Sequence, residues 1–128
     1  MMKNAWMQTG ILLCSIAAMA LPGVKSPVRI EVEPTVWRGP CPHSFRFNGT
    51  VISRGGGVVY YHWERSDGSS TPTQSTAFAR ADVERTLYNE WHLTRAPKQN
   101  FRGWEQLVVT KPNFIRSFKA VINLQCSR

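Results

Sequence analysis

The sequence contains few acidic residues, few cysteines and no long apolar run. Its 128 residues include only 8 Asp and Glu against 16 Lys and Arg, which gives a net charge of +8 at pH 7. Because 42% of the residues are apolar and 19% are charged, the composition is that of a globular protein and excludes a disordered chain. No stretch of about 18 uncharged apolar residues occurs, so no transmembrane segment is expected. The length fits a single domain.

The residue patterns that mark enzymes and cofactor sites are also missing. The three histidines, His43, His62 and His92, do not stand at metal-ligand spacing, and no serine lies in a G-x-S-x-G nucleophile turn. The glycine run at 55–57 lacks the lysine and the helix of a phosphate-binding loop. His62 and Glu64 share one strand face and could hold an ion, but alternating polar residues on a solvated sheet explain them equally well. We therefore predict no catalytic, cofactor-binding or metal-binding residues.

The first twenty residues have the three parts of a secretory signal peptide. Lys3 precedes an uncharged apolar stretch at 11–18, and this stretch ends in the small-x-small sequence Ala18-Met19-Ala20. A signal peptide at residues 1–20 predicts an exported protein, periplasmic or extracellular, with a short flexible lead-in at 21–26. A buried N-terminal helix is the alternative.

Cleavage of the signal peptide would remove Cys14 and leave Cys41 and Cys126 as the two remaining cysteines. In an oxidising compartment these two are expected to form a disulfide. The bridge would span a sequence separation of 85 residues, for which chain entropy gives a stabilisation of roughly 4.5 kcal/mol. Two free or metal-binding thiols are one alternative. Lipidation of Cys14 is another, although Leu13 before it is not the small residue that lipidation needs.

Beyond residue 27 the apolar residues recur with the period of two that is typical of β-strands. The segment from Phe118 to Cys126 is the clearest, because every second residue is apolar and is expected to point inward. Trp63 is expected to fill the core. Turn sequences rich in glycine and serine at 55–57 and 66–70 separate neighbouring segments. The predicted strands cover residues 28–33, 44–51, 58–64, 73–78, 83–93, 106–110 and 118–126.

These segments predict an all-β protein, an antiparallel two-sheet β-sandwich of about seven strands, in one domain at residues 27–127. The polar segment at 73–78 suits the edge of a sheet. Residues 96–103 are polar and are expected to form a loop. A short helix at 80–88 is the alternative to the beginning of the strand at 83–93.

Several short motifs are spread along the domain in a fixed order. They are Gly39-Pro40-Cys41-Pro42-x-x-Phe45-x-Phe47-x-Gly49, Val59-x-Tyr61-x-Trp63-x-Arg65-Ser66-Asp67-Gly68, Trp91-x-Leu93, Gly103-Trp104-x-x-Leu107-x-Val109 and Leu124-x-Cys126. Their order and spacing resemble small secreted bacterial immunoglobulin-like domains. The resemblance covers residues 30–126 and implies an immunoglobulin-like or fibronectin-III-like sandwich in an exported protein. It implies no catalytic residues.

The positive charge and the aromatic residues outside the predicted core indicate a binding surface. Eleven of the 16 basic residues are arginine, which forms paired contacts with carboxylates and phosphates and stacks on aromatic rings. Loss of one lysine with the signal peptide would lower the charge from +8 to +7, which still attracts anionic partners. The predicted candidate surface comprises Trp37, Arg46, Tyr60, Arg65 and Tyr88.

We expect an exported, non-catalytic binding or interaction module whose partner is another protein or an anionic envelope polymer. No specific nucleic-acid partner is expected, because no nucleic-acid-binding motif is present and export removes the usual target. A structural accessory domain without a dedicated ligand is the main alternative, and a small secreted enzyme is the third hypothesis.

Overall fold

The computed structural model describes residues 21–94 and 99–127, and the predicted signal peptide lies outside them. The described residues form β1 (Arg29–Glu33), β2 (Val36–Pro40), β3 (His43–Ile52), β4 (Gly57–Arg65), β5 (Gln74–Phe78), β6 (Glu84–Leu93), β7 (Asn100–Lys111), β8 (Ile115–Arg116) and β9 (Ala120–Ser127). Within this part of the chain there is no helix with the length and apolar content needed to cross a membrane.

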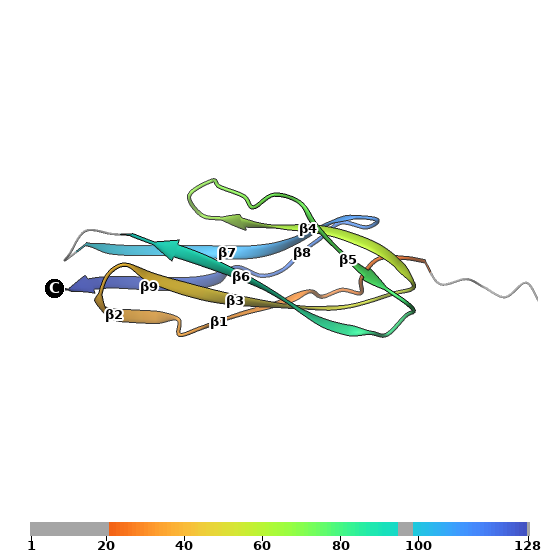
Figure 1. Cartoon of the computed structure of the whole chain (residues 1–128), viewed down its shortest axis with the longest axis horizontal. Coiled ribbons are helices and arrows are strands. Elements are labelled where there is room, and N and C mark those ends of the chain that lie inside the picture. The colour runs from red at the N-terminus through yellow and green to blue at the C-terminus, as the bar shows by residue number, and fades with distance from the viewer. Residues whose placement is uncertain (1–20, 95–98, 128) are drawn as a thin grey trace, which may run out of the picture.

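The strands form two sheets that face each other in an elongated sandwich (Figure 1). The three-stranded sheet has the order β1-β3-β6, and the six-stranded sheet has the order β2-β9-β7-β4-β5 with β8 paired to β7. The chain passes from the first sheet to the second between β1 and β2. The strand pairs are antiparallel, except that β2 runs parallel to β9.

Alternating apolar residues of the facing strands fill the space between the sheets. Phe45 and Phe47 of β3, Trp63 of β4 and Leu107 of β7 are completely buried. Trp63 therefore has the core position that its strand pattern predicts. Gly49 reflects the tight packing beside it, because a Cβ atom there would lie 2.5 Å from a side-chain carbon of Leu107.

The predicted all-β, two-sheet sandwich is confirmed, and β6 occupies the region for which a helix was the alternative. Two strands were not predicted. β2 contains Gly39 and Pro40, which are unfavourable in strands, and β8 has only two residues. β7 begins at Asn100, so the loop expected at 96–103 is wrong for its last four residues, while 96–98 lie outside the described residues.

Part of the predicted lead-in at 21–26 belongs to the packed domain. The side chain of Val24 is completely buried, and its backbone forms a β-bridge with Ser53. The side chain of Asn113 holds the same residue, accepting a hydrogen bond from the Val24 amide at 3.1 Å and donating one to its carbonyl at 2.9 Å. The packed part of the chain therefore includes Val24, three residues before the predicted boundary.

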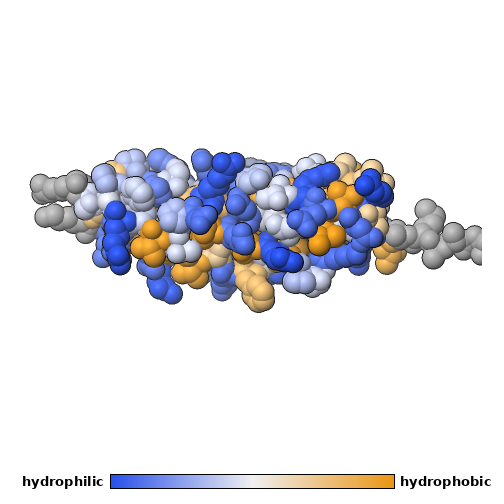
Figure 2. Space-filling view, turned by 90° about the horizontal axis from the view of Figure 1, so that it is seen from below, coloured by the Kyte–Doolittle hydropathy of each residue, from blue (hydrophilic) through white to orange (hydrophobic). Residues whose placement is uncertain are grey.

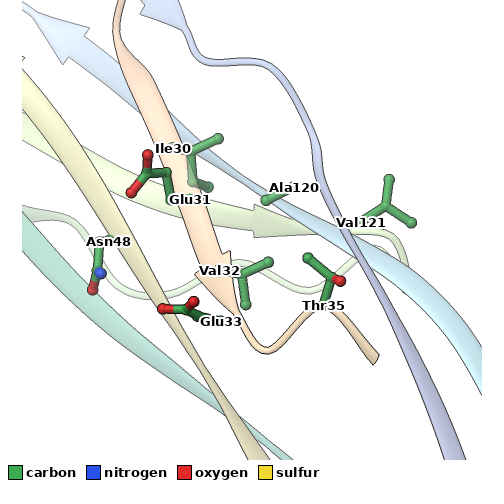
Figure 3. A pocket seen from close by; sticks show the side chains of 8 residues that line it. All are labelled: Ile30, Glu31, Val32, Glu33, Thr35, Asn48, Ala120 and Val121. Carbon is green, nitrogen blue, oxygen red and sulfur yellow. The ribbon is translucent and has the colours of Figure 1, made fainter. Parts of the chain in front are cut away.

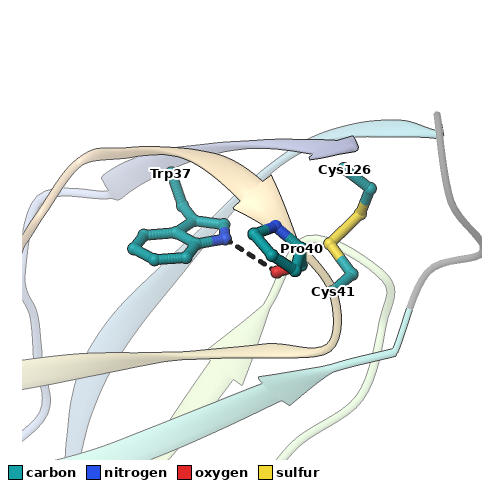
Figure 4. Close-up of a disulfide and its surroundings, with 4 residues drawn as sticks. All are labelled: Trp37, Pro40, Cys41 and Cys126. Carbon is teal, nitrogen blue, oxygen red and sulfur yellow. Dashed lines mark hydrogen bonds between the residues drawn. A yellow bond between two sulfur atoms is a disulfide. The ribbon is translucent and has the colours of Figure 1, made fainter. Parts of the chain in front are cut away.

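A disulfide joins Cys41 to Cys126, as predicted (Figure 4). Cys41 lies two residues before β3 of the three-stranded sheet, and Cys126 lies in β9 of the six-stranded sheet. Their Cα atoms are 5.4 Å apart. Because Cys41 also directly follows β2, which pairs with β9, the bridge ties the connection between β2 and β3 to β9.

Candidate binding surface

The structure does not bring the five predicted surface residues together. Arg46 and Tyr88 lie on the three-stranded sheet, and Tyr60 lies on β4 of the six-stranded sheet. Trp37 lies beside the disulfide (Figure 4), and Arg65 lies between the sheets. Arg46 and Tyr88 therefore form one exposed pair, and Tyr60 is exposed by itself. The side chains of Trp37 and Arg65 instead make contacts within the domain.

Arg46 and Tyr88 form the exposed pair. The guanidinium carbon of Arg46 lies 4.7 Å from the centroid of the Tyr88 ring, and Tyr88 is 55% exposed. Asn89 and Glu90 line a shallow hollow beside them. Because Glu90 is directly opposite Arg46 in the strand register, an acidic group offsets the positive charge at this place.

Arg65 is held between the two sheets and is not free to bind a ligand. Its Nε donates to Glu105 Oε1 at 2.8 Å, and its Nη2 donates to the Glu90 carbonyl at 3.1 Å. Asn89 of β6 donates to the other carboxylate oxygen of Glu105 at 2.8 Å. Glu105 is completely buried, and this burial raises its pKa even though the hydrogen bonds from Arg65 and Asn89 act in the opposite direction. The cluster therefore connects the sheets with buried polar groups.

Trp37 and Tyr60 have different surroundings. The Trp37 ring stacks on His43 with 4.0 Å between the ring centroids, and its indole N–H donates to the Pro40 carbonyl at 3.1 Å (Figure 4). Trp37 is half-buried and packs against the core, so it supports the disulfide end of the sandwich. Tyr60 is 42% exposed and lines a shallow hollow with Lys111.

A more prominent exposed cluster, none of whose residues is in the predicted candidate surface, lies around β8. Phe114 and Phe118 are 60% and 80% exposed, although phenylalanine usually packs inside a domain. The guanidinium of Arg116 lies 5.4 Å from the Phe114 ring centroid, and Lys119 Nζ lies 4.4 Å from that of Trp104. We call Trp104, Phe114, Arg116, Phe118 and Lys119 the β8 patch.

The backbone of the β8 patch is fixed by a buried serine. Ser117 is buried, and its amide donates to the Leu107 carbonyl at 2.9 Å. Its hydroxyl oxygen accepts from the Leu107 amide at 2.9 Å, and its carbonyl accepts from the Gln106 side chain at 2.9 Å. Ser117 thus takes an inward place that the strict alternation of 118–126 would give to Phe118. The prediction that Phe118 points inward is wrong for this reason.

Charge is distributed unequally between the two sheets. The strands of the three-stranded sheet contain three basic and four acidic residues. The strands of the six-stranded sheet contain five basic and two acidic residues, of which Glu105 is buried. The segment 106–121, which includes most of the β8 patch, contains three basic residues and no acidic residue. This segment therefore contributes only positive charge to the surface around the patch.

One acidic residue does reach the β8 patch from β4. Arg116 Nη1 donates to Glu64 Oε1 at 2.5 Å, and His62 Nε2 lies 2.9 Å from Glu64 Oε2. The hydrogen bond with His62, followed by that from Arg116, lowers the pKa of Glu64. The pair of His62 and Glu64 considered above as an ion site is thus part of a small hydrogen-bonded chain. Among residues 21–94 and 99–127, no group of three or more His, Cys, Asp or Glu could hold a metal ion.

A groove between β1 and β9 is a weaker candidate for ligand binding. Ile30 and Val32 point from β1 toward Ala120, whereas Glu31 and Glu33 point to the opposite side of the strand (Figure 3). Ile30, Val32 and Ala120 of this groove already pack against the core. On the face shown in Figure 2, small apolar areas alternate with hydrophilic ones, so no broad apolar surface is visible there.

Comparison with known proteins supports the fold but not a specific ligand. No protein-family model matches the chain, and no curated protein matches its sequence. The chain is similar to the CARDB domain of a Pyrococcus furiosus protein, solved in complex with di-metal ions, with a TM-score of 0.53 and 13% identity over 87% of this chain and 93% of that one. Because that domain is immunoglobulin-like, the similarity supports an immunoglobulin-like sandwich.

A second similarity is to the Pseudomonas fluorescens alkylpurine DNA glycosylase AlkC bound to DNA containing an abasic site analog. The TM-score is 0.47 and the identity is 19%, over 77% of this chain. The aligned region spans only 30% of the glycosylase chain.

Proposed function

We propose that the protein is an exported, non-catalytic binding module that contacts an anionic partner through the β8 patch. Three features support the proposal. The N-terminal sequence has the pattern of a signal peptide, the disulfide suits an oxidising compartment, and the exposed surface includes a basic and aromatic cluster.

The observation that carries the proposal is the exposure of Phe118 on a backbone that cannot move it inward. Hydrogen bonds at Ser117 fix the adjacent peptide groups, and Phe118 is 80% exposed. An exposed aromatic side chain leaves apolar surface in water, and contact with another molecule would remove that surface. Arg116 and Lys119 on either side add positive charge, which attracts an anionic surface over several ångströms.

Capture from an envelope extract tests the proposal. We expect the immobilised protein to retain an anionic component at about 0.05 M salt and to release most of it at about 0.5 M, because the screening length falls to a few ångströms. The double variant Arg116→Gln/Lys119→Gln should lose most of this capture. The matched control Arg29→Gln/Arg46→Gln, which removes the same charge from the three-stranded sheet, should keep it.

Three other outcomes contradict the proposal in different ways. No capture at either salt concentration favours a structural accessory domain, and turnover of a component of the extract favours an enzyme. Equal loss of capture in both double variants would mean that net charge acts without a defined site.

A further inference from the structure

We propose that the β8 patch docks on the surface of an anionic lipid bilayer, with Phe118 and Phe114 in the interfacial layer and Arg116 and Lys119 against lipid phosphates. This inference rests on the proposed binding function and specifies the chemistry of the partner. It follows from the combination of exposed apolar rings and cations in one short segment of the chain.

The two phenylalanines distinguish a bilayer from a soluble polyanion. Phe114 and Phe118 are 60% and 80% exposed, and neither side chain has a polar group that could bind a phosphate or carboxylate. A soluble anionic polymer would leave these rings in water, whereas the boundary between headgroups and acyl chains removes apolar surface from water. Of these two partners, only an anionic bilayer would contact both the phenylalanine rings and the basic side chains.

The charges around the rings match an anionic membrane. Lys111, Arg116 and Lys119 lie in a segment, 106–121, that has no acidic residue. Basic residues near an anionic bilayer each strengthen binding by about fivefold to tenfold, because the surface potential attracts them. Arg116 is partly neutralised by Glu64, so Lys119 is expected to contribute more than Arg116.

The shape of the segment also favours a deformable partner. Phe118 projects into solvent from the short connection between β8 and β9, and a folded protein would need a complementary cavity to cover it. Asn113 and Ser117 hold the two parts of the segment through hydrogen bonds to Val24, Leu107 and Gln106. A fixed backbone lowers the ordering cost of inserting the rings, since the exposed conformation is already formed.

Vesicle sedimentation tests the inference. The purified protein is mixed with phosphatidylcholine vesicles that contain or lack phosphatidylglycerol. We expect sedimentation with the anionic vesicles alone. The double variant Phe114→Ala/Phe118→Ala should bind at least about tenfold more weakly, because it loses two large apolar groups from the interface. Tyr88→Ala, which removes an exposed aromatic residue from the other sheet, should bind like the wild type.

The wild type and the variants have the same residues 1–20. Any contribution of the apolar stretch at 11–18 to sedimentation with vesicles is therefore the same for all of them. An unchanged midpoint of urea unfolding verifies that the double variant is folded, as the exposure of both rings predicts.

Absence of wild-type sedimentation with anionic vesicles overturns the lipid inference. If the envelope extract still yields a salt-sensitive, β8-dependent soluble partner, the proposed function stands without the lipid. If both experiments show no binding, the two proposals fail together. Sedimentation that is equal for the wild type and Phe114→Ala/Phe118→Ala rejects ring insertion, because charge alone would then account for the attraction.

Discussion

Both sheets place an arginine beside an aromatic ring, but the two places differ in charge and in exposure. On the three-stranded sheet, Arg46 lies over Tyr88, and Glu90 faces Arg46 in the neighbouring strand. On the six-stranded sheet, Arg116 lies beside Phe114 in a segment without acidic residues. An acidic residue lies near the arginine at both places, since Glu64 of β4 pairs with Arg116. The second place differs in its exposed apolar rings and in the additional positive charge of Lys119.

A cation near an aromatic ring does not distinguish the two places, because both have one. The Tyr88 side chain has a hydroxyl group that can remain in water at the sheet surface, whereas the Phe118 side chain has no polar atom. The backbone at Ser117 is what keeps Phe118 exposed. The proposed binding role therefore rests on the exposed apolar ring of Phe118, which the fold prevents from packing.

The largest predicted effect tests whether the inner and outer faces of the six-stranded sheet are assigned correctly. Trp63→Ala should lower the free energy of unfolding by roughly 3–5 kcal/mol, because Trp63 is completely buried between the sheets. Tyr60→Ala, three residues earlier and on the opposite face, should cost much less, since Tyr60 is 42% exposed. Urea denaturation measures both. Equal losses of unfolding free energy in the two variants would show that the inner and outer faces of β4 are assigned the wrong way round. The comparison of the two sheet surfaces would then lose its basis.

A smaller effect is expected at the serine that fixes the β8 patch. Ser117→Ala should cost about 1–3 kcal/mol, because it leaves the buried Leu107 amide without its acceptor. The control is Ser44→Ala on the three-stranded sheet, where the hydroxyl meets His92 at the surface at 2.8 Å. Ser44→Ala should change the free energy of unfolding by no more than about 0.5 kcal/mol in the same urea experiment. A silent Ser117→Ala would mean that Phe118 is not held in its exposed place.

The smallest effect concerns the buried polar contact between the sheets. Burial raises the pKa of Glu105, so the folded state holds this proton more tightly than the unfolded state does. Its contribution to stability should therefore fall as the pH rises above the ordinary value of 4.5, toward neutrality. Glu105→Gln removes the titrating group and should make this decline disappear.

Unfolding free energies of the wild type and Glu105→Gln, measured at several pH values between about 4.5 and 7.5, give the difference due to Glu105. His43, whose pKa is lowered by burial, is present in both proteins and cancels. A difference that does not change with pH would contradict the raised pKa.

The alternation of apolar residues predicted the sandwich, the core position of Trp63 and most strands, because a strand with one buried face imposes a period of two on its sequence. The disulfide was predictable from the two cysteines that would remain if the predicted signal peptide were removed. Arg65 was misjudged because its partner Glu105 lies 40 residues away in the chain, and sequence spacing alone does not show a contact between strands. The pattern therefore predicts which face is buried but not which polar groups meet.

The β8 patch was missed for a related reason. Phe118 and Ile122 are four residues apart and fit one inward-facing series, but the structure buries Ser117 and exposes Phe118 before that series begins. A usable signal was present in the segment that follows Pro112, where two phenylalanines alternate with basic residues and no acidic residue occurs. The exposure of Phe118 depends on the hydrogen bonds between Ser117 and Leu107 of β7, which the sequence does not show.

The central claim is that binding depends on the β8 patch and not on net charge, and elution from an immobilised polyanion tests it most directly. Arg116→Gln/Lys119→Gln and Arg29→Gln/Arg46→Gln each remove two positive charges, the first pair from the β8 patch and the second from the three-stranded sheet. We predict that the first variant elutes from dextran sulfate at clearly lower salt than the wild type, and that the second elutes close to the wild type. Equal shifts of the two variants would contradict the account.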